Sequence, residues 1–283
     1  MEPLVSIITT THNIIENKQA DTFNLSVALL RLQTLPFIEH IVIDNASTDG
    51  TIDLLNEHKN KGHLIFYSEK NINKFDAYNK GILHARGKYI AFISCDDFFH
   101  DITALYDLIN GMEYENADFS FSPAYCRHPD NFVFLYNPSL FNVFQVMPCS
   151  RQCMFFKKSV LVSEKCFDTK FKYLADYDLI IRLVMKKYKP IYFNQVYLTY
   201  KLGEKLFNEP QLGDNEAKMI FLKNYRALYQ LNEELLNKMV KMSEFPKALL
   251  EKLATYFPEA DSELFFERCE QMHQLRLQSL QQK

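Results

Sequence analysis

Residues 38–51 read IEHIVIDNASTDGT, and this stretch carries the pattern that decides the fold. Its first six residues are mostly apolar and predict a buried strand that ends at Asp44. A polar turn follows over residues 45–50, and Thr51 opens a short helix. A buried strand that leads through a polar turn into a helix is the repeating unit of a parallel sheet covered by helices.

The same alternation of strand and helix runs through the first hundred residues. Strands are predicted at residues 4–9, 38–43, 63–67 and 88–93. Helices are predicted from Asp21 to before Pro36, from Thr51 to His58 and from Phe75 to Arg86. Asp21 is a suitable N-cap of the first helix, and Gly87 is a suitable C-terminal cap of the third. These elements predict an α/β fold, a Rossmann-like and mostly parallel sheet with flanking helices.

The pattern changes after about residue 115. Shorter strands are predicted at residues 118–125, 131–136 and 152–157, followed by a helix over 176–187 and a strand over 191–200. From about residue 206 onward the chain reads as helix only. The sequence therefore predicts an α/β domain over residues 1–205 and a helical C-terminal extension over residues 206–283.

Charge and composition exclude several classes of protein. The chain has 283 residues and a net charge of −3, whereas a nucleic-acid binder usually carries a strong basic excess. Its six cysteines show no zinc-binding spacing, which favours free thiols in a reducing compartment. No signal peptide is visible, and no apolar run approaches the roughly 20 residues that span a bilayer. We expect a soluble, cytoplasmic protein without a transmembrane segment that can associate with the inner face of the membrane.

Polar side chains follow three of the predicted strands at the point where each strand ends. Thr10 to Asn13 follow the first strand, Asp44 ends the second, and Asp96 follows the fourth. The carboxyl ends of parallel strands meet at one edge of a sheet, and ligands of such sheets bind there. We therefore expect these side chains to converge on one binding site.

Four segments of the chain are informative when they are taken together and in order. They read VSIITTTHN at residues 5–13, VIDNASTDGT at 42–51, DAYNKG through ARGKYI to SCDD within 76–97, and LADYDL at 174–179. On these segments the chain resembles the family 2 glycosyltransferases, which have the GT-A fold, over about residues 4–200. The third segment is similar to the subgroup that builds colanic acid and related bacterial surface polysaccharides. The resemblance implies transfer of a sugar from a nucleotide diphosphate to a hydroxyl group.

The resemblance also implies roles for individual residues. Asp96 matches the aspartate that binds the metal, and Asp176 matches the catalytic base. The residues expected to contact the nucleotide and the rest of the donor are Thr10, Thr11, Asn13, Asp44, Asp76, Asn79 and Asp97. Arg151 and Gln152 occupy a place where His-Gln is common in this subgroup, and we expect them to contact the acceptor or a phosphate.

The chemistry of the transfer explains why carboxylates are needed in two places. A nucleotide diphosphate leaves readily only when its growing negative charge is stabilised, which a divalent metal does as a Lewis acid. Oxygen ligands suit Mn²⁺ or Mg²⁺, so we expect one of these ions at Asp96. Asp176 would take the proton of the acceptor hydroxyl on the face of the sugar opposite the diphosphate. A single displacement from that face inverts the anomeric carbon.

The leading interpretation is therefore an inverting glycosyltransferase of the hexosyl- or N-acetylhexosaminyltransferase class. The resemblance implies that Asp44 reads a pyrimidine base, which favours a UDP-sugar as the donor, and it implies a glycan or lipid-linked acceptor in bacterial polysaccharide biosynthesis. The helices after residue 206 are expected to shape the acceptor side or a homodimer contact. This interpretation requires Asp96 and Asp176 to face the sugar from opposite sides of one cleft.

Three positions differ from the family pattern and keep a second interpretation open. Ser94 stands where the metal motif usually begins with an acid, Ala175 replaces a glutamate, and Arg151 replaces a histidine. A degenerate, non-catalytic partner that binds a nucleotide sugar with the same fold would carry such changes. A nucleotidyltransferase ranks lower, because Thr10 to Asn13 provide no glycine-rich, basic triphosphate loop.

Several of these residues also have a purely structural interpretation. Asp96 and Asp97 could cap the next helix, and Asp44 could be an ordinary turn residue at the end of its strand. Asp176 could be the N-cap of the helix that follows it. A structural role and a functional role can coexist at each of these positions.

Residues of the predicted helix over 75–86 and of the strand before Asp96 also have either a structural or a functional interpretation. Asp76 and Asn79 share one face of that helix, which either points them at the donor or makes the helix surface polar. Cys95 is interpreted as a small residue that fills the strand end and not as a nucleophile. Lys80 could pair with a diphosphate, as Arg151 could, or could be a solvated surface charge.

Overall fold

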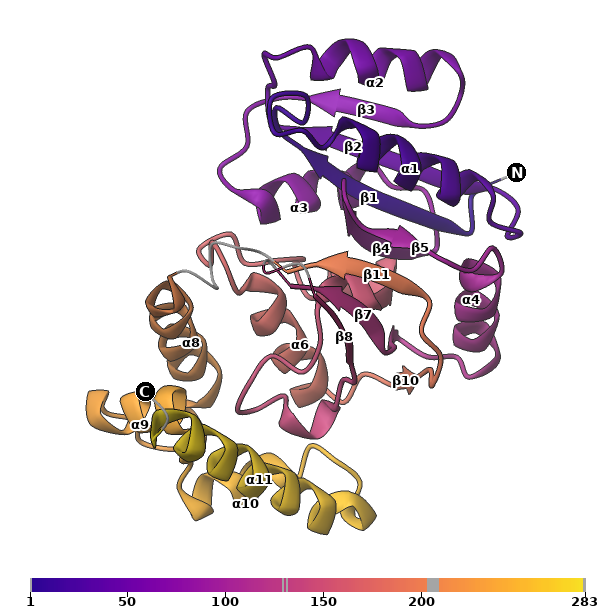
Figure 1. The fold of residues 1–283 in the computed structure, drawn as a ribbon. Helices are drawn as coiled ribbons and strands as arrows, with labels where there is room; N and C mark the ends of the chain where they lie inside the picture. The colour runs from indigo at the N-terminus through magenta and orange to yellow at the C-terminus, as the bar shows by residue number, and fades with distance from the viewer. Residues whose placement is uncertain (1, 129, 131, 203–208, 282–283) are drawn as a thin grey trace. The chain divides into compact units, whose positions relative to one another are not determined.

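The computed structural model describes residues 2–128, 130, 132–202 and 209–281 (Figure 1). The expected strand over 131–136 and the expected extension from residue 206 each begin outside these described residues. The chain forms two compact units. The first comprises residues 1–138, 150–172 and 189–202, and the second comprises residues 139–149, 173–188 and 203–283.

The first unit is built on a seven-stranded sheet with the strand order β10-β6-β9-β4-β1-β2-β3. Its strands are β1 Val5–Thr11, β2 Ile38–Asp44, β3 Ile65–Ser68, β4 Tyr89–Ser94, β6 Phe119–Phe121, β9 Met154–Lys157 and β10 Pro190–Tyr192. The strands from β3 through β2 and β1 to β4 pair in parallel, and β9 runs antiparallel between β4 and β6. The prediction of a mostly parallel α/β sheet is confirmed.

Helices cover both faces of this sheet. Successive residues of β1 point to opposite sides, so Ile7 and Ile8 pack against different helices. The helices of the first unit are α1 Ala20–Arg31, α2 Thr51–Asn60, α3 Lys74–His84, α4 Ala104–Tyr114 and α5 Lys158–Ser163. On one face, Ile7 packs in an apolar cluster with Leu30 of α1 and Leu105 of α4. On the other face, a Cβ atom on Gly81 of α3 would come within 2.5 Å of the Ile8 side chain, so α3 lies very close to the sheet.

A second, four-stranded sheet with the order β5-β11-β7-β8 belongs to the same unit. Its strands are β5 Phe98–Phe99, β7 Ala124–Arg127, β8 Val133–Tyr136 and β11 Leu198–Lys201. β7 and β11 run parallel, while β5 and β8 are antiparallel to the strands beside them. This small sheet brings the end of β11 to the turn that follows β4, because the backbone N of Lys201 donates to Asp97.

Two strand predictions are wrong. Residues 118–125 divide into β6 and β7, and residues 191–200 divide into β10 and β11, so each segment passes from the large sheet to the small one. Pro123 lies at the first of these breaks and has no N–H group with which to continue a ladder. Apolar periodicity predicts a strand but does not predict the sheet that the strand joins.

Two helices of the described residues, α4 and α5, were not predicted from the sequence. α4 buries Leu105, Leu108, Ile109 and Met112 at helical spacing, so a periodic signal for it is present in the chain. α5 has only six residues and gives no comparable signal. Short 3-10 turns occur at η1 Leu140–Asn142, η2 Arg151–Cys153 and η3 Glu259–Asp261.

Two predictions of helix caps are also wrong. α1 begins at Ala20 after the N-cap residue Gln19, so Asp21 lies in the first turn. α3 ends at His84, so Gly87 does not cap this helix. A Cβ atom on Gly87 would lie 2.5 Å from the backbone N of Ser6. Glycine is required at position 87 because the backbone before β4 passes against the backbone of β1.

Within the described residues, the second unit is helical apart from turns and short 3-10 helices. Its helices are α6 Ala175–Met185, α8 Pro210–Tyr225, α9 Glu233–Met242, α10 Lys247–Ala254 and α11 Ser262–Gln281. Phe144 is central to its core, and the Phe144 ring centroid lies 6.1 Å from that of Tyr225 and 5.7 Å from that of Phe257. The C-terminal helices are confirmed, and a domain boundary at residue 205 stays a prediction.

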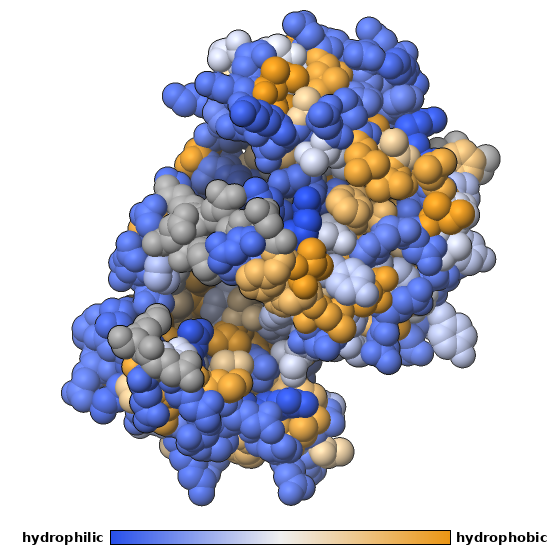
Figure 2. Space-filling model, in the orientation of Figure 1, coloured by the Kyte–Doolittle hydropathy of each residue, from blue (hydrophilic) through white to orange (hydrophobic). Residues whose placement is uncertain are grey.

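The molecular face drawn in Figure 2 is mostly hydrophilic, with apolar patches between the polar residues. Exposed apolar side chains of the first unit include Leu32, Phe37 and Tyr114. Scattered exposed apolar residues are normal on a folded protein. Among the described helices, none combines the length and the apolar character needed to cross a bilayer.

Substitution of Gly87 by alanine tests the close backbone contact between the start of β4 and β1. We expect Gly87→Ala to lower the free energy of unfolding by about 1–3 kcal/mol, because the new methyl group meets main-chain atoms that cannot turn away. Urea unfolding followed by circular dichroism measures the change.

Gly111→Ala is the matched control. Its Cβ would come equally close, at 2.5 Å, to the Phe193 ring, which is a side chain and can rotate. Alanine also favours the helix by about 1 kcal/mol relative to glycine. The control should therefore lose less stability than Gly87→Ala, and equal losses in the two variants would contradict the backbone argument.

Candidate functional site

The ends of three neighbouring parallel strands place the predicted polar residues at one edge of the large sheet. Thr11 at the end of β1 lies in register with Asp44 at the end of β2. Thr10 lies in register with Ser94 at the end of β4, two residues before Asp96. The expected convergence of these three polar clusters at one sheet edge is confirmed.

The loops after β1 and β2 hold each other in place through hydrogen bonds. The backbone N of Asn45 donates to the carbonyl of Thr11 at 2.9 Å. The backbone N of Asn13 donates to Ser47 Oγ at 2.8 Å, and the Asn13 side-chain oxygen accepts from the backbone N of Thr48 at 3.0 Å. Asn13 has a positive φ of 49°, a conformation that asparagine tolerates better than most residues. The two loops therefore form one structure.

The Asp44 carboxylate is the centre of this structure and is completely buried. Three hydroxyl groups and one backbone amide donate to it: Thr11 Oγ1 at 3.0 Å, Ser47 Oγ at 2.5 Å, Ser68 Oγ at 2.7 Å and Ser47 N at 2.9 Å. A buried carboxylate is stable only when such donors replace its hydration. Asp44 thus ties together the ends of three strands, and its contact with a nucleotide stays a prediction.

Asp97 is the second buried carboxylate at this edge. It accepts hydrogen bonds from the backbone N of Ser94 at 2.7 Å and from the backbone N of Lys201 at 3.1 Å. Burial raises the pKa of Asp97 above its ordinary value, against the opposing effect of these two donors. Asp97 fastens the turn after β4 to the small sheet. A contact between Asp97 and the donor stays a prediction.

Asp96 lies next to Asp97 but in a different environment. Its side chain is partly exposed, and Gln19 Nε2 lies at 3.5 Å from the carboxylate. No group of three or more metal-ligating side chains occurs in the described part of the chain. A divalent ion on a nucleotide diphosphate needs only one or two protein carboxylates in addition to the phosphates. Asp96 fits that requirement.

Cys95 precedes the two aspartates and is buried. Burial, together with the negative charges of Asp96 and Asp97, raises the pKa of the Cys95 thiol to about 12. The thiolate is the reactive form of cysteine, so this thiol is not a nucleophile near neutral pH. The geometry agrees with the interpretation of Cys95 as a small residue that fills the strand end.

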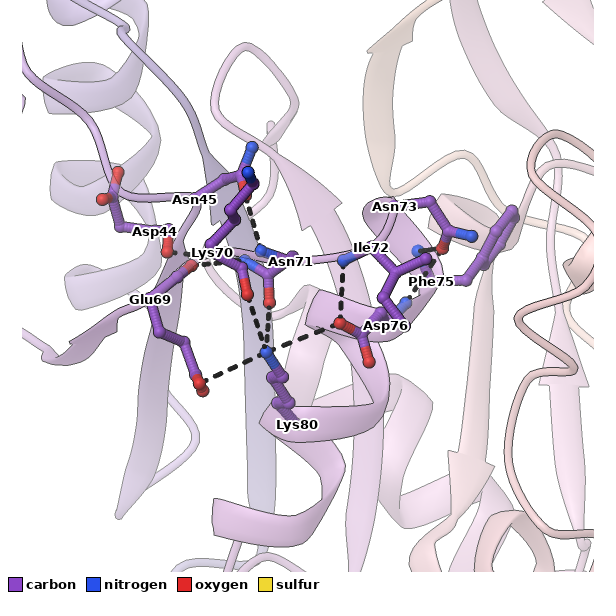
Figure 3. Close-up of polar contacts among 10 residues, drawn as sticks. All are labelled: Asp44, Asn45, Glu69, Lys70, Asn71, Ile72, Asn73, Phe75, Asp76 and Lys80. Atoms are coloured by element: carbon purple, nitrogen blue, oxygen red, sulfur yellow. Dashed lines mark hydrogen bonds and ion pairs between the residues drawn. The ribbon is translucent and has the colours of Figure 1, made fainter.

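The loop between β3 and α3 is held by Lys80 (Figure 3). Four oxygen atoms surround Lys80 Nζ. They are Asn71 Oδ1 at 2.9 Å, Lys70 O at 3.3 Å, Glu69 Oε2 at 3.3 Å and Asp76 Oδ2 at 3.5 Å. Asp76 also accepts from the backbone N of Ile72 at 3.0 Å. The side chains of Lys80 and Asp76 therefore fix the path of residues 69–72.

This loop is connected in turn to the turn after β2. The backbone N of Asn71 donates to Asn45 Oδ1 at 2.8 Å, as Figure 3 shows. The Asn71 side chain reaches the carbonyl of Asp44 at 3.5 Å. Lys80 is thus connected to the sheet edge through Asn71, which contacts both Lys80 and the turn after β2. This part of the site was not predicted, because none of the quoted motifs includes residues 69–73.

Asn79 lies one turn from Asp76 on α3 but holds a different segment. Its amide donates to the carbonyl of Phe167 at 2.9 Å and accepts from the backbone N of Phe167 at 3.0 Å. The shared helix face therefore directs Asp76 and Asn79 to two separate pieces of backbone. Contact of either side chain with the donor stays a prediction.

Arg151 and Gln152 are both buried in η2. The Arg151 guanidinium donates to the Tyr78 hydroxyl at 2.8 Å and lies 4.8 Å from the centroid of the Tyr78 ring. Gln152 accepts a short hydrogen bond from Ser150. The contacts of Arg151 attach η2 to α3, and the predicted contact of Arg151 and Gln152 with an acceptor or phosphate stays a prediction.

Asp176 belongs to the second unit. α6 begins at Ala175 after the N-cap residue Leu174, so the interpretation of Asp176 as the helix N-cap is wrong. The Asp176 side chain is buried and accepts from the backbone N of Tyr177 at 3.1 Å. Asp96 lies in the first unit, and the expected approach of Asp96 and Asp176 to one sugar stays a prediction.

Asp178 is a charged centre of the second unit that was not predicted. Its fully buried carboxylate accepts hydrogen bonds from Arg182 Nε at 2.9 Å, Lys223 Nζ at 2.9 Å and Asn224 Nδ2 at 3.1 Å. The spacing of Asp178 and Arg182 on one helix face was the available sequence signal. This network joins α6 to α8, and its role is therefore structural.

The match to a family model covers more than half of the chain. Residues 6–161 match the model of glycosyl transferase family 2. The chain therefore belongs to glycosyl transferase family 2, which confirms the family that the four sequence segments indicated.

Curated relatives resemble part of the chain. The putative teichuronic acid biosynthesis glycosyltransferase TuaG of Bacillus subtilis is 35% identical over 99 residues, 34% of this chain and 37% of that protein. The UDP-Glc:alpha-D-GlcNAc-diphosphoundecaprenol beta-1,3-glucosyltransferase WfaP of Escherichia coli is 34% identical over 122 residues, 43% of this chain and 46% of that protein. The chain thus matches less than half the length of these two relatives.

Solved structures resemble the chain over nearly its whole length. S. aureus TarS 1–349 in complex with UDP-GlcNAc has a TM-score of 0.62 and 13% identity, covering 98% of this chain and 91% of that chain. The mannosyltransferase PcManGT from Pyrobaculum calidifontis, in complex with GDP-Man and Mn²⁺, has a TM-score of 0.61 and 17% identity, covering 99% and 75%. At such identities the likeness shows the fold alone, and it confirms a GT-A-like fold with C-terminal helices.

The adjacent aspartates Asp96 and Asp97 should differ in their contribution to stability. Asp97→Ala removes a buried carboxylate and leaves two backbone N–H groups without their acceptor, and we expect it to lower the free energy of unfolding by about 2–4 kcal/mol. Asp97→Asn keeps an acceptor oxygen and should lose less. Urea unfolding of the purified variants measures both changes.

Asp96→Ala is the control, because among the described residues the partly exposed Asp96 side chain has one long hydrogen bond, to Gln19 at 3.5 Å. It should cost less than about 1 kcal/mol, as is usual for a surface substitution. If the two alanine variants were equally stable, the structural role of Asp97 would be rejected.

Lys80→Met tests whether Lys80 fixes the loop between β3 and α3. Removal of the ammonium group leaves the loop oxygens without their common donor, so hydrogen exchange at the Asn71 and Ile72 amides should accelerate about tenfold. Hydrogen exchange with mass spectrometry measures this, and Lys61→Met, which removes an exposed Lys61–Glu57 pair, is the matched control. Unchanged exchange at Asn71 and Ile72 in Lys80→Met would rule out this role.

Proposed function

We propose that the chain is an inverting, metal-dependent glycosyltransferase of the hexosyl- or N-acetylhexosaminyltransferase class. It transfers a sugar from a UDP-sugar to a hydroxyl of a glycan or lipid-linked acceptor in bacterial surface-polysaccharide biosynthesis. The observation that carries the proposal is the partly exposed Asp96 carboxylate, held at the sheet edge where the loops of β1 and β2 meet. Membership of glycosyl transferase family 2 supports the reaction class.

Asp96 is the residue proposed to hold Mn²⁺ or Mg²⁺. Lewis-acid stabilisation of the leaving diphosphate is the chemistry that such a bound ion supplies. The buried Asp97 keeps the Asp96 main chain fixed against the small sheet, so little reorganisation is needed at the moment of bond cleavage. The structure of PcManGT, described as a complex with Mn²⁺, supports a metal in a protein of this fold.

The proposed nucleotide site consists of the two interlocked loops. Thr10, Thr11 and Asn13 of the first loop and Asp44 of the second lie at the same sheet edge as Asp96. Asp76, Asn79 and Asp97 are proposed to act on the donor from the surrounding elements. WfaP is named for a UDP-Glc donor, and TarS is described with UDP-GlcNAc, which supports a uridine nucleotide.

Asp176 is proposed as the general base. Its carboxylate takes the proton from the acceptor hydroxyl while the oxygen attacks the anomeric carbon, and the diphosphate leaves from the opposite face. This single displacement inverts the anomeric centre through a transition state with oxocarbenium character. Arg151 and Gln152 are proposed to contact the acceptor or a phosphate.

The acceptor and the location are proposed from the relatives. WfaP is named for a diphosphoundecaprenol-linked acceptor, and TuaG for teichuronic acid biosynthesis, which supports a surface glycan assembled on a lipid carrier. The colanic acid type is proposed from the third sequence segment. An enzyme with such an acceptor would work at the cytoplasmic face of the membrane. Residues 1–205 are proposed as the catalytic domain and residues 206–283 as an extension that shapes the acceptor side or a homodimer contact.

A second candidate is a non-catalytic partner that binds a nucleotide sugar. The burial of Asp97 favours it, because that carboxylate is already occupied by two backbone donors and Ser94 offers no acid in its place. Only Asp96 is then available to a metal at this motif. Ala175, which replaces the glutamate before the proposed base, points in the same direction.

Nucleotide binding and turnover separate the two candidates. UDP with Mn²⁺ should raise the melting temperature of the protein more than GDP, CDP or dTDP, because a ligand that binds only the folded state stabilises it by mass action. Asp96→Asn should remove the gain that Mn²⁺ adds. A thermal-shift panel with and without Mn²⁺ measures these effects.

Asp176→Asn should keep UDP binding and lower sugar transfer or donor hydrolysis by about 10²–10⁴-fold, the usual contribution of a general base. Radiolabelled UDP-sugars measure turnover. Asp168→Asn is the acidic control, since Asp168 lies in the first unit, its carboxylate accepts from the backbone N of Lys170 at 3.2 Å, and no catalytic role is proposed for it. Nucleotide binding without any turnover in the wild-type protein would favour the non-catalytic partner. Absence of binding to all four nucleotide diphosphates would reject both candidates.

A further inference from the structure

Arg127 is the last residue of β7 and lies beside the turn that carries Asp96. Its Nη2 atom donates a short hydrogen bond to the main-chain oxygen of Asp96. The guanidinium carbon lies 5.7 Å from the centroid of the Phe98 ring, which follows the same turn. Two contacts with one turn therefore hold the Arg127 cation next to Asp96.

The small sheet places a second cation beside Arg127. Lys201 of β11 lies in parallel register with Arg127, and its backbone N donates to Asp97. Side chains in register on neighbouring strands point to the same face of a sheet. Arg127 and Lys201 thus lie side by side on one face of the small sheet, next to the turn of Asp96 and Asp97.

The Arg127 guanidinium has donor capacity beyond its contact with Asp96. A guanidinium carries five N–H donors in a planar fork. The Nη2 atom reaches Asp96, while the buried Nε atom has no hydrogen-bond partner within the described residues. A planar cation with spare donors matches the geometry of phosphate oxygens better than an ammonium group does.

We propose that Arg127 is a ligand of the donor diphosphate, binding a phosphate oxygen beside Asp96. This inference rests on the proposed function and adds a residue of the same site. Ser94 provides no acid, and the Asp97 carboxylate is held by two backbone N–H groups, so few acids compete for Arg127 at this turn. The protein itself thereby supplies part of the positive charge that the diphosphate requires.

This arrangement has a consequence for binding in the absence of metal. UDP should bind the metal-free protein more tightly than uridine does, because Arg127 recognises the diphosphate without help from Mn²⁺. The difference between UDP and uridine should shrink as salt is added, since the contact is a partly exposed ion pair. Uridine affinity should not depend on salt.

Isothermal titration of UDP and uridine, in EDTA and in Mn²⁺, tests the proposal on the full chain. Arg127→Met should weaken UDP binding in EDTA about tenfold, the loss expected for one charge-assisted contact, and leave uridine binding unchanged. Arg127→Lys keeps the charge but not the fork and should lie between Arg127→Met and the wild type. Arg31→Met is the matched control, because exposed Arg31 at the end of α1 lies near the beginning of the strands, away from the Asp96 edge.

The outcomes distinguish a ligand from a positioning residue. If Arg127→Met binds UDP as the wild type does in EDTA and loses only the gain that Mn²⁺ adds, Arg127 merely positions Asp96 and the proposal is overturned. Equal losses for UDP and uridine would also overturn it, because they would indicate damage to the fold. If Arg127→Met does not fold, Arg127→Lys and the salt dependence of the wild type decide the matter.

The test also separates this inference from the function on which it rests. A wild-type protein that binds no nucleotide diphosphate would reject the proposed function itself. A wild-type protein that binds UDP, together with an Arg127→Met variant of equal affinity in EDTA, would reject only the role of Arg127.

Discussion

The buried carboxylate of Asp44 is the constraint on which the whole sheet edge depends. A carboxylate without access to water must be surrounded by donors, and here they come from Thr11, Ser47 and Ser68 on three different segments. Satisfying one charge therefore fixes three strand ends at once. Asn13, with its positive φ, belongs to the same connected structure. So does the loop between β3 and α3, because Lys80 contacts Asn71 and Asn71 donates to Asn45.

Two neighbouring aspartates of this edge differ in how the structure holds them. Asp97 is buried, hydrogen-bonded to two backbone amides and raised in pKa by burial, so it stabilises the turn. Asp96 is partly exposed, and its main chain is held by Asp97 on one side and by Arg127 on the other. The rigid pair of contacts around Asp96 leaves its carboxylate available to a ligand. A charged group held in this way is what electrostatic catalysis requires.

Much of the first unit could be predicted because its signals are local. The apolar run before Asp44 and the helical spacing of Phe23, Val27 and Leu30 each lie within one segment, and their burial follows directly. Gly87 was predicted to cap a helix, but it is required for a close backbone contact. The sequence could not distinguish the two roles, because both call for a glycine. Pro123 marks the break within residues 118–125, but the sheet that each half joins could not be predicted, since strand pairing depends on distant segments.

The sequence by itself indicated the family through its four ordered segments. It also determined the mostly parallel sheet and the gathering of polar residues at its carboxyl edge, because the alternation of strands and helices fixes strand direction. Only the tertiary structure decided which aspartate is buried and which is exposed. The contact of Asp97 with Lys201 joins residues 104 positions apart, and that of Asp96 with Arg127 joins residues 31 positions apart. Such contacts depend on how two sheets meet in space, and no local pattern of residues encodes that meeting.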